Sequence, residues 1–351
     1  MYIKTIRLNN IYIMKPLLIF AFLVGFSVAY SQTNIQKKNV RTYNSFVNKA
    51  ELFVCDKQYK KASDCYAEAF KSHDPFAQDA YFAFRVNYEQ VRDTLRILEC
   101  IQHLIKLGDR PDWIIEDSTK DPYFYRCAQE LFETTKIEVI PSLNQEFLEI
   151  LESDQRVMTQ YFESDEEFFN AIDSVMRLNL KRLKRMYRKY SVVNDYTVGR
   201  SVTGLYVPLI HLCKYLNYDA KKILSKEVRK GNYNVQKYII LKDYCLNFSP
   251  KYNSNETTIY GTNLNWGIND IYFILQPKNL PKVNRRRRRL LTDETWQDYE
   301  KKVEYIVTKR VDYFFYAPKT WIDKSSDEME NSLRQSIDDG SVRGTYLHIT
   351  P

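Results

Sequence analysis

Apolar residues recur at helical spacing through most of the chain, and the first clear pair of helices lies between residues 40 and 75. Phe46, Ala50 and Phe53 share one helical face, and a second apolar face follows after Asp56-Lys57-Gln58. Residues three and four apart lie on one side of a helix, so this pattern predicts two antiparallel helices joined by a short turn. The second face consists of Tyr59, Ala62, Tyr66, Ala69 and Phe70.

The same apolar pattern returns after a shift of 35 residues, so that Phe46 maps onto Tyr81 and Tyr66 onto Ile101. It predicts helices near 77–90 and 92–107, ended by Gly108, and a third helical piece after Asp121-Pro122. Helical hairpins with small residues at their close contacts resemble the tetratricopeptide repeat. The resemblance implies a stack of hairpins over residues 40–137 with a groove for a peptide or protein, or a short solenoid that only supports the second half.

A second helical unit begins near Ile140-Pro141 and predicts a domain over residues 141–310. Its first long helix runs through Phe147 and Val157, and Ser164 with Glu167 forms a capping box for a helix that extends to about residue 190. An apolar segment over residues 205–216 contains His211, and further helices are expected at about 219–229, 234–247 and 292–310.

Two stretches change to the composition of strands. Residues 257–263 and 271–276 are rich in Thr, Ile, Tyr and Phe, and they predict a β-hairpin on a helical body. The tail over residues 324–351 is polar, and we expect it to be loosely held. The predicted fold class is therefore mainly α, with an N-terminal stack of helical hairpins and a helical C-terminal domain that carries a small β-hairpin.

The front of the chain has the pattern of an export signal. Residues 16–31 carry no charge, Lys4, Arg7 and Lys15 precede them, and Ala29-Tyr30-Ser31 is a small-x-small cleavage pattern. We interpret residues 1–31 as a cleaved signal peptide, with a retained anchor as the alternative. The expected location is the periplasm or the outside of the cell, without a stable membrane anchor after cleavage.

The composition limits the classes of binding partner that we expect. The net charge of +8 favours association with acidic surfaces, and for an exported protein these are anionic envelope components rather than nucleic acid. An oxidising compartment permits disulfides, but buried free thiols are an equal alternative for a chain of this size. The cysteines are Cys55, Cys65, Cys100, Cys127, Cys213 and Cys245.

The order of short motifs in the second half resembles a known family. The motifs are Asp154-Gln155-Arg156, Asn179, Leu183-Lys184, Val198-Gly199, Leu209-Ile210-His211, Tyr238 to Asp243, Tyr260-Gly261-Thr262, an Arg-rich turn and Trp296 to Tyr299. Residues from about 145 to 308 are similar to the bacterial domain of unknown function numbered 6624. The resemblance implies a helical domain with a small hairpin that follows helical repeats in exported proteins, and it implies no defined activity.

This chain departs from the family pattern at three places. Asn263 stands where a Gln is usual, Asn284 and Arg285 replace two acids, and Leu212-Cys213-Lys214 lacks the acid that normally follows the histidine. If the family used a carboxylate at those positions, this chain has lost it.

His211 is the best candidate for a catalytic side chain, because imidazole is the usual base near neutral pH. The alternative is a buried histidine that is hydrogen-bonded to the backbone. None of the four histidines is spaced for a zinc site, and no cofactor motif occurs, so no metal or cofactor is expected. The groups that the fold could bring to His211 are Asp154, Arg156, Tyr260, Thr262 and Asn263.

Two basic features are candidate anion sites. The first is the run Arg285, Arg286, Arg287, Arg288 and Arg289, whose alternative is an exposed loop with one or two arginines paired to acids inside the domain. The second is one face of the helix predicted to end near residue 190, whose alternative is a simply solvated surface. That face carries Arg177, Lys181, Arg182, Lys184, Arg185, Arg188 and Lys189.

Three functions follow from these features. The first is an exported, non-catalytic protein that binds a protein or peptide at its helical repeats. The second is a hydrolase-like enzyme with a site around His211 and the Tyr260–Asn263 hairpin. The third is a polyanion binder, for which we expect one continuous basic face.

Overall fold

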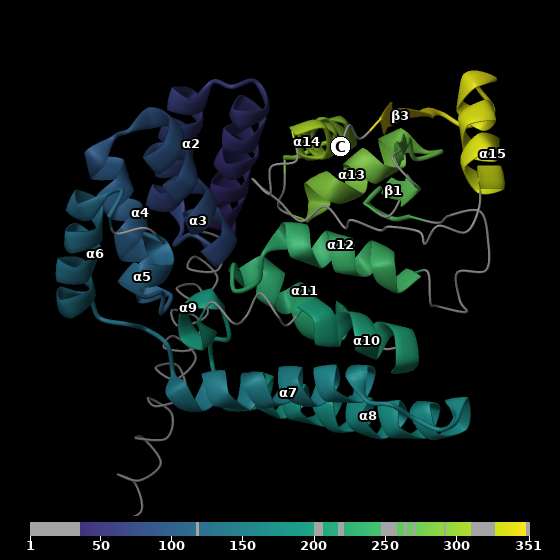
Figure 1. Ribbon diagram of the computed structural model, residues 1–351, viewed down its shortest axis with the longest axis horizontal. Coiled ribbons are helices and arrows are strands. Elements are labelled where there is room, and N and C mark those ends of the chain that lie inside the picture. The colour runs from purple at the N-terminus through teal and green to yellow at the C-terminus, as the bar shows by residue number, and fades with distance from the viewer. Residues whose placement is uncertain are drawn as a thin grey trace, which may run out of the picture.

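The computed structural model describes residues 36–116, 119–199, 206–216, 221–246, 258–262, 265–268, 271–290, 293–309 and 327–348. The fold is mainly α and is built from packed helix pairs, as the periodicity predicts. Figure 1 shows the helices of the first half on the left and a second group of helices with a small sheet on the right. The predicted signal segment 1–31 and Asn263 lie outside the described residues.

The first half is a set of helices packed around one aromatic and aliphatic core. Ala50, Ala62 and Ala69 are fully buried, so the helices approach closely where the sequence places small residues. Gly108 follows the fourth helix in the left-handed conformation that glycine adopts freely, with a φ of +90°. The elements are a helix over residues 36–55, α2 (Tyr59–Ser72), α3 (Ala77–Arg85), the π-helical η1 (Val86–Val91), α4 (Thr94–Lys106), α5 (Pro111–Ile114) and α6 (Pro122–Thr134).

Residues of the second half complete the first-half core. Tyr196 is buried in it, and Tyr305 packs against it. The backbone N–H of Ala77 donates to Asp195 Oδ2 at 2.7 Å, which satisfies a donor at the start of α3. The two halves therefore contact each other, through packed side chains and a hydrogen bond, on either side of the predicted boundary at Ile140-Pro141.

Helices α7 (Pro141–Thr159) and α8 (Asp165–Lys189) form a long antiparallel pair at the bottom of Figure 1. The predicted cap is present, because Ser164 Oγ accepts from the backbone N–H of Glu167 at 3.2 Å. The reciprocal bond of a capping box is shifted by one residue, since Glu167 accepts from the N–H of Glu163.

Four helices connect this pair to the top of the molecule: α9 (Asp195–Val198), α10 (Tyr206–Leu216), α11 (Lys221–Lys230) and α12 (Val235–Leu246). A disulfide between Cys213 and Cys245 ties α10 to α12, and the other four cysteines form none. This bridge is consistent with an oxidising compartment but does not establish export.

The β-hairpin is present, but its first strand lies later in the chain than the composition predicts. Strand β1 (Asn265–Ile268) pairs antiparallel with β2 (Ile271–Leu275), with Asn265 opposite Ile274. Residues 258–262 form no strand, because their polar backbone groups bind a buried carboxylate, as described below. Tertiary hydrogen bonds have overridden the β-propensity of that stretch.

The described part of the tail is folded, which corrects the expectation of a loosely held segment. Helix α15 (Asp327–Asp338) leads into strand β3 (Gly344–His348), which pairs antiparallel with β2, with Tyr272 opposite Leu347. Helices α13 (Leu280–Arg289) and α14 (Trp296–Lys309) pack beside the sheet. Among the described helices, none combines the length and apolar character that crossing a membrane requires.

Candidate functional site

His211 and Asp154 are brought together by α10 and α7. His211 Nδ1 lies 2.8 Å from Asp154 Oδ2, and the Asp154 side chain is fully buried while that of His211 is 15% exposed. A carboxylate can only accept hydrogen bonds, so Nδ1 carries the proton in this pair and Nε2 is left as the basic nitrogen. The sequence prediction that Asp154 could approach His211 is therefore confirmed.

The surroundings of Asp154 are only partly satisfied. Its Oδ2 also accepts from Gln155 Nε2 at 2.9 Å, whereas its Oδ1 is buried without a hydrogen-bond partner among the described residues. Arg156 is exposed and, being two residues further along α7, points to the other side of the helix. Arg156 therefore does not join the His211–Asp154 pair.

Tyr260 and Thr262 have a structural task at a different carboxylate. Asp243 is fully buried and accepts from the N–H of Tyr260 at 2.9 Å and from both the N–H and the hydroxyl of Thr262. Because the Thr262 hydroxyl already donates to a carboxylate and is buried, it is not poised as a nucleophile. The predicted hairpin site is thus an anchored turn.

Helices α13 and α14 hold the same turn from the other side. Arg287 donates to the carbonyl oxygen of Tyr260 at 2.8 Å, and Trp296 Nε1 donates to that of Gly261 at 3.2 Å. A Cβ on Gly261 would lie 2.3 Å from the Trp296 ring, so only glycine fits. The motifs Tyr260-Gly261-Thr262 and Trp296 to Tyr299 therefore serve mutual packing.

The arginine run is the second half of helix α13 and not a loop. Arg287 is fully buried and paired with Glu294, so it is not available to an external anion. Arg285, Arg288 and Arg289 are exposed, and with Arg41 they border a hollow of about 670 Å³. One inward arginine paired to an acid of the same domain is one of the alternatives that the sequence left open.

A buried ion network joins the two halves, and the sequence analysis missed it. Lys302 of α14 donates to Glu294 at 2.8 Å and to Glu51 of the helix over residues 36–55, and both acids are at most 2% exposed. Arg287 completes the network through Glu294. The partners Glu51 and Lys302 are 251 positions apart, and Lys301-Lys302 has the pattern of a solvated pair, so no local signal reveals the network.

Burial and neighbouring charges shift the pKa values of these groups in opposite directions. Burial raises the pKa of Glu51 to about 8, although Lys302 opposes this shift. Burial also acts to raise the pKa of Glu294, but Lys302 and Arg287 outweigh it and hold the pKa below its ordinary value. The two carboxylates raise the pKa of Lys302 against the effect of burial, so the ammonium stays charged.

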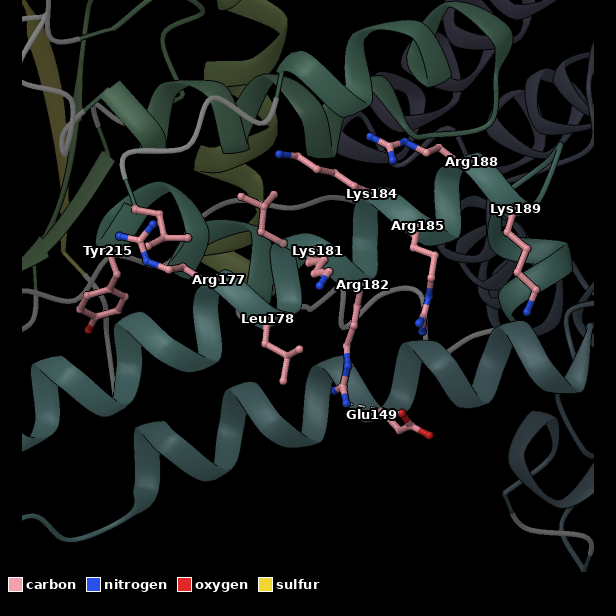
Figure 2. Close-up of a pocket in the computed structure, with 12 residues that line it drawn as sticks. Glu149, Arg177, Leu178, Lys181, Arg182, Lys184, Arg185, Arg188, Lys189 and Tyr215 are labelled. Atoms are coloured by element: carbon pink, nitrogen blue, oxygen red, sulfur yellow. Dashed lines mark ion pairs between the residues drawn. The ribbon is translucent and has the colours of Figure 1, made fainter.

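The basic face of α8, shown in Figure 2, concentrates positive charge on the described surface. It lines an open hollow of about 1280 Å³ together with Glu149, Tyr215 and three leucines. We call its seven cations the basic strip: Arg177, Lys181, Arg182, Lys184, Arg185, Arg188 and Lys189. All of them except the half-buried Arg182 are exposed.

The basic strip consists of two rows. The inner row, Arg182, Arg185 and Lys189, faces α7 and pairs with its acids. Arg182 lies 3.9 Å from Glu149, while Arg185 and Lys189 lie 3.5 Å and 2.8 Å from Glu146. Figure 2 shows Arg182 directed at Glu149, whereas Lys184 and Arg188 point to the opposite side of α8.

The outer row consists of Arg177, Lys181, Lys184 and Arg188. Its spacing of four, three and four residues places the side chains on one line along the helix, about 16 Å long. Arg177 pairs with Asp173 at 2.6 Å. Within the described ranges, Lys181 and Arg188 form no ion pair. The outer row therefore presents positive charge that α7 does not neutralise.

The basic strip and the exposed arginines of α13 lie on different elements, and Figure 1 shows helices α10, α11 and α12 between α8 and α13. One continuous basic face stays a prediction. In the part of the chain that the structure describes, no group of three or more His, Cys, Asp or Glu side chains is arranged to hold a metal ion.

Comparison with known proteins gives no relative for this chain. No protein-family model, no curated protein and no solved structure matches it. The comparisons support neither the tetratricopeptide assignment nor the resemblance to the domain of unknown function numbered 6624. What stands is the coarser description, a mainly helical protein of packed helix pairs.

Proposed function

We propose that this chain is a non-catalytic binding protein whose basic strip on α8 holds an acidic partner. One observation carries the proposal: seven cations gather along one helix, and among the described residues Asp173, Glu146 and Glu149 pair with four of them, while Lys181 and Arg188 form no ion pair. An excess of like charge beside an open hollow attracts anions and raises their local concentration.

The arrangement also has a cost that argues against a merely solvated surface. Cations three and four residues apart on a helix repel one another by about 0.2–0.5 kcal/mol per pair. The outer row contains such pairs at every step, including Lys181 with Lys184 and Lys184 with Arg188. A bound polyanion would remove this repulsion. A binding role therefore explains why α8 carries like charges at positions where they destabilise the helix.

The location and the type of partner are part of the proposal. We place the protein in the periplasm or outside the cell, where an anionic envelope component is the acidic partner; the Cys213–Cys245 disulfide agrees with this. A protein partner at the helical repeats has less support. The hollow described on that half is lined by charges of both signs, among them Arg110, Asp112, Arg126 and Glu130.

The proposal is tested by retention on an immobilised polyanion. We expect the wild type to bind heparin and to elute as salt rises, and the Lys181→Gln/Arg188→Gln variant to elute at clearly lower salt. The matched control is Arg285→Gln/Arg288→Gln, which removes the same charge from exposed positions of α13. Equal elution of wild type and the α8 variant, or earlier elution of the α13 control alone, contradicts the proposal.

A hydrolase-like activity is the second candidate, and the His211–Asp154 pair favours it. A buried carboxylate on Nδ1 fixes the tautomer in which Nε2 can accept a proton from water or a hydroxyl. The test is hydrolysis of an activated ester by the wild type and by His211→Gln, compared with a second half-buried histidine as control, His73→Gln. Activity that His211→Gln abolishes supports this candidate, and equal rates in all three proteins refute it.

A further inference from the structure

We infer that the acidic partner is an extended polymer that carries one acidic group on each repeat unit and contains neither amino acids nor nucleobases, and that it lies along α8 on the outer row. This inference rests on the proposed function and makes it more specific. It concerns the length and chemistry of the ligand, which follow from how the four outer cations are spaced.

The outer row is linear and longer than a compact anion. Successive side chains are about 6, 4.5 and 6 Å apart along the axis of α8, over a total of about 16 Å. A single phosphate or carboxylate contacts only neighbouring cations, so it leaves the rest of Arg177, Lys181, Lys184 and Arg188 unused. A linear polyanion can place an acid at each of them, and the open hollow beside α8 leaves room for a chain to lie along it.

An acidic helix of another protein fits this surface poorly. Helices that pair in water need an apolar seam at positions spaced four and three residues apart. On α8 those positions are the outer row itself, and all four are charged. Leu178 and Leu180 flank the row, but each lies on a different side of it.

Single-stranded nucleic acid also fits poorly. Its sequence-tolerant binding depends on several aromatic side chains on which successive bases stack. Among the described residues that line this hollow, Tyr215 is the one aromatic, and it lies at the Arg177 end (Figure 2). A polymer of acidic sugars or of phosphodiester units needs no such series of rings. Arginine binds either acid through paired N–H groups, and lysine binds either as a point charge.

The test is calorimetric titration of the full chain with oligogalacturonates of increasing length, from the monomer to the octamer. A parallel series uses inorganic polyphosphates, which separates carboxylate from phosphate as the preferred acid. We expect affinity to rise with length and to level off once the oligomer spans about 16 Å. Either series behaving in this way supports the inference and identifies the acid.

Salt dependence counts the contacts. Four contacts to a flexible polyanion predict a slope of log affinity against log salt near −3, and roughly 50-fold weaker binding at about 200 mM than at about 50 mM salt. Lys181→Gln/Arg188→Gln should halve this slope and weaken binding about 25-fold at about 0.1 M salt. Arg285→Gln/Arg288→Gln should change neither quantity. Thermal melting confirms that each variant is folded, since both pairs of side chains are exposed.

The outcomes distinguish the two proposals. If no acidic oligomer of any length binds, the proposed function fails. If the monomer binds as tightly as the octamer, or if the slope stays the same in Lys181→Gln/Arg188→Gln, an acidic partner stands but the extended polymer is overturned. Tighter binding of oligothymidylate or of polyglutamate than of both polyanion series at equal charge also overturns it, in favour of nucleic acid or of an acidic protein.

Discussion

Replacing Lys302 with methionine is the most direct test of how the two halves are held together. Lys302 is 1% exposed and is the cation shared by Glu51 and Glu294. Among the described residues, its removal leaves Glu51 without a cation and Glu294 with Arg287 as its remaining cation, and both acids are at most 2% exposed. Breaking a buried ion pair by removing one partner costs about 3–5 kcal/mol, because the remaining charge stays desolvated.

The neighbouring residue supplies a matched control. Lys301 also bridges the halves, since its ammonium lies 2.7 Å from Asp56, but both side chains of this pair are more than 40% exposed. An exposed pair contributes about 0–1 kcal/mol. Lys301→Met and Lys302→Met therefore remove the same charge from the same helix, and they differ mainly in burial.

The assay is thermal and urea unfolding of both variants beside the wild type at about pH 9, where Glu51, with a pKa of about 8, is ionised. At about 2–4 °C per kcal/mol, we expect Lys302→Met to lower the melting temperature by about 6–20 °C and Lys301→Met by at most about 4 °C. The double variant Glu51→Gln/Lys302→Met should lose less than the sum of its single changes, because a neutral side chain at 51 needs no cation. Equal losses in Lys301→Met and Lys302→Met, or strict additivity in the double variant, would refute the reasoning.

Three further predictions concern other parts of the structure. Because the pKa of Glu51 is raised to about 8, the folded state keeps a proton that the unfolded chain releases near 4.5. The free energy of unfolding should therefore fall as pH rises between these values, by at most about 1.4 kcal/mol per pH unit. Urea titrations should show this slope in the wild type and not in Glu51→Gln. Reduction of Cys213–Cys245, which spans 32 residues, should cost about 4 kcal/mol, and reductant should leave Cys213→Ala/Cys245→Ala unchanged; an equal response of both proteins would contradict this. Gly231→Ala should cost at least about 2 kcal/mol, because its Cβ would lie 2.4 Å from His73 Nε2 at a φ of +78°, whereas Gly340→Ala, with no neighbour within 4 Å, should cost about 1 kcal/mol; chemical denaturation that ranks them in reverse would disprove the steric argument.

Local signals in the sequence predicted the helices well. Periodicity located α7 and α8, Ser164 marked a helix start, and Gly108 marked a helix end. These features depend on residues a few positions apart, so they are readable without a structure. The first strand was misplaced because residues 258–262 have strand-like composition but form hydrogen bonds to Asp243, which lies in helix α12.

The candidate site was predictable only in part. His211 and Asp154 were both singled out, and they meet, but Arg156 lies on the wrong face of α7 and Thr262 is engaged by Asp243. The basic strip follows from helical spacing alone. Its division into a paired inner row and an outer row does not, because this depends on Glu146 and Glu149 of a different helix.

The distance along the chain between Glu51 and Lys302 has a consequence for biogenesis. A polypeptide made from its N-terminus presents Glu51 long before the cation that stabilises it, with 251 positions between them. The N-terminal helices therefore stay incompletely packed until α14 has been synthesised. A prematurely terminated product that lacks α14 would leave this acid without Lys302 and the contact of Tyr305 unmade, so proteases should degrade it while sparing the finished molecule.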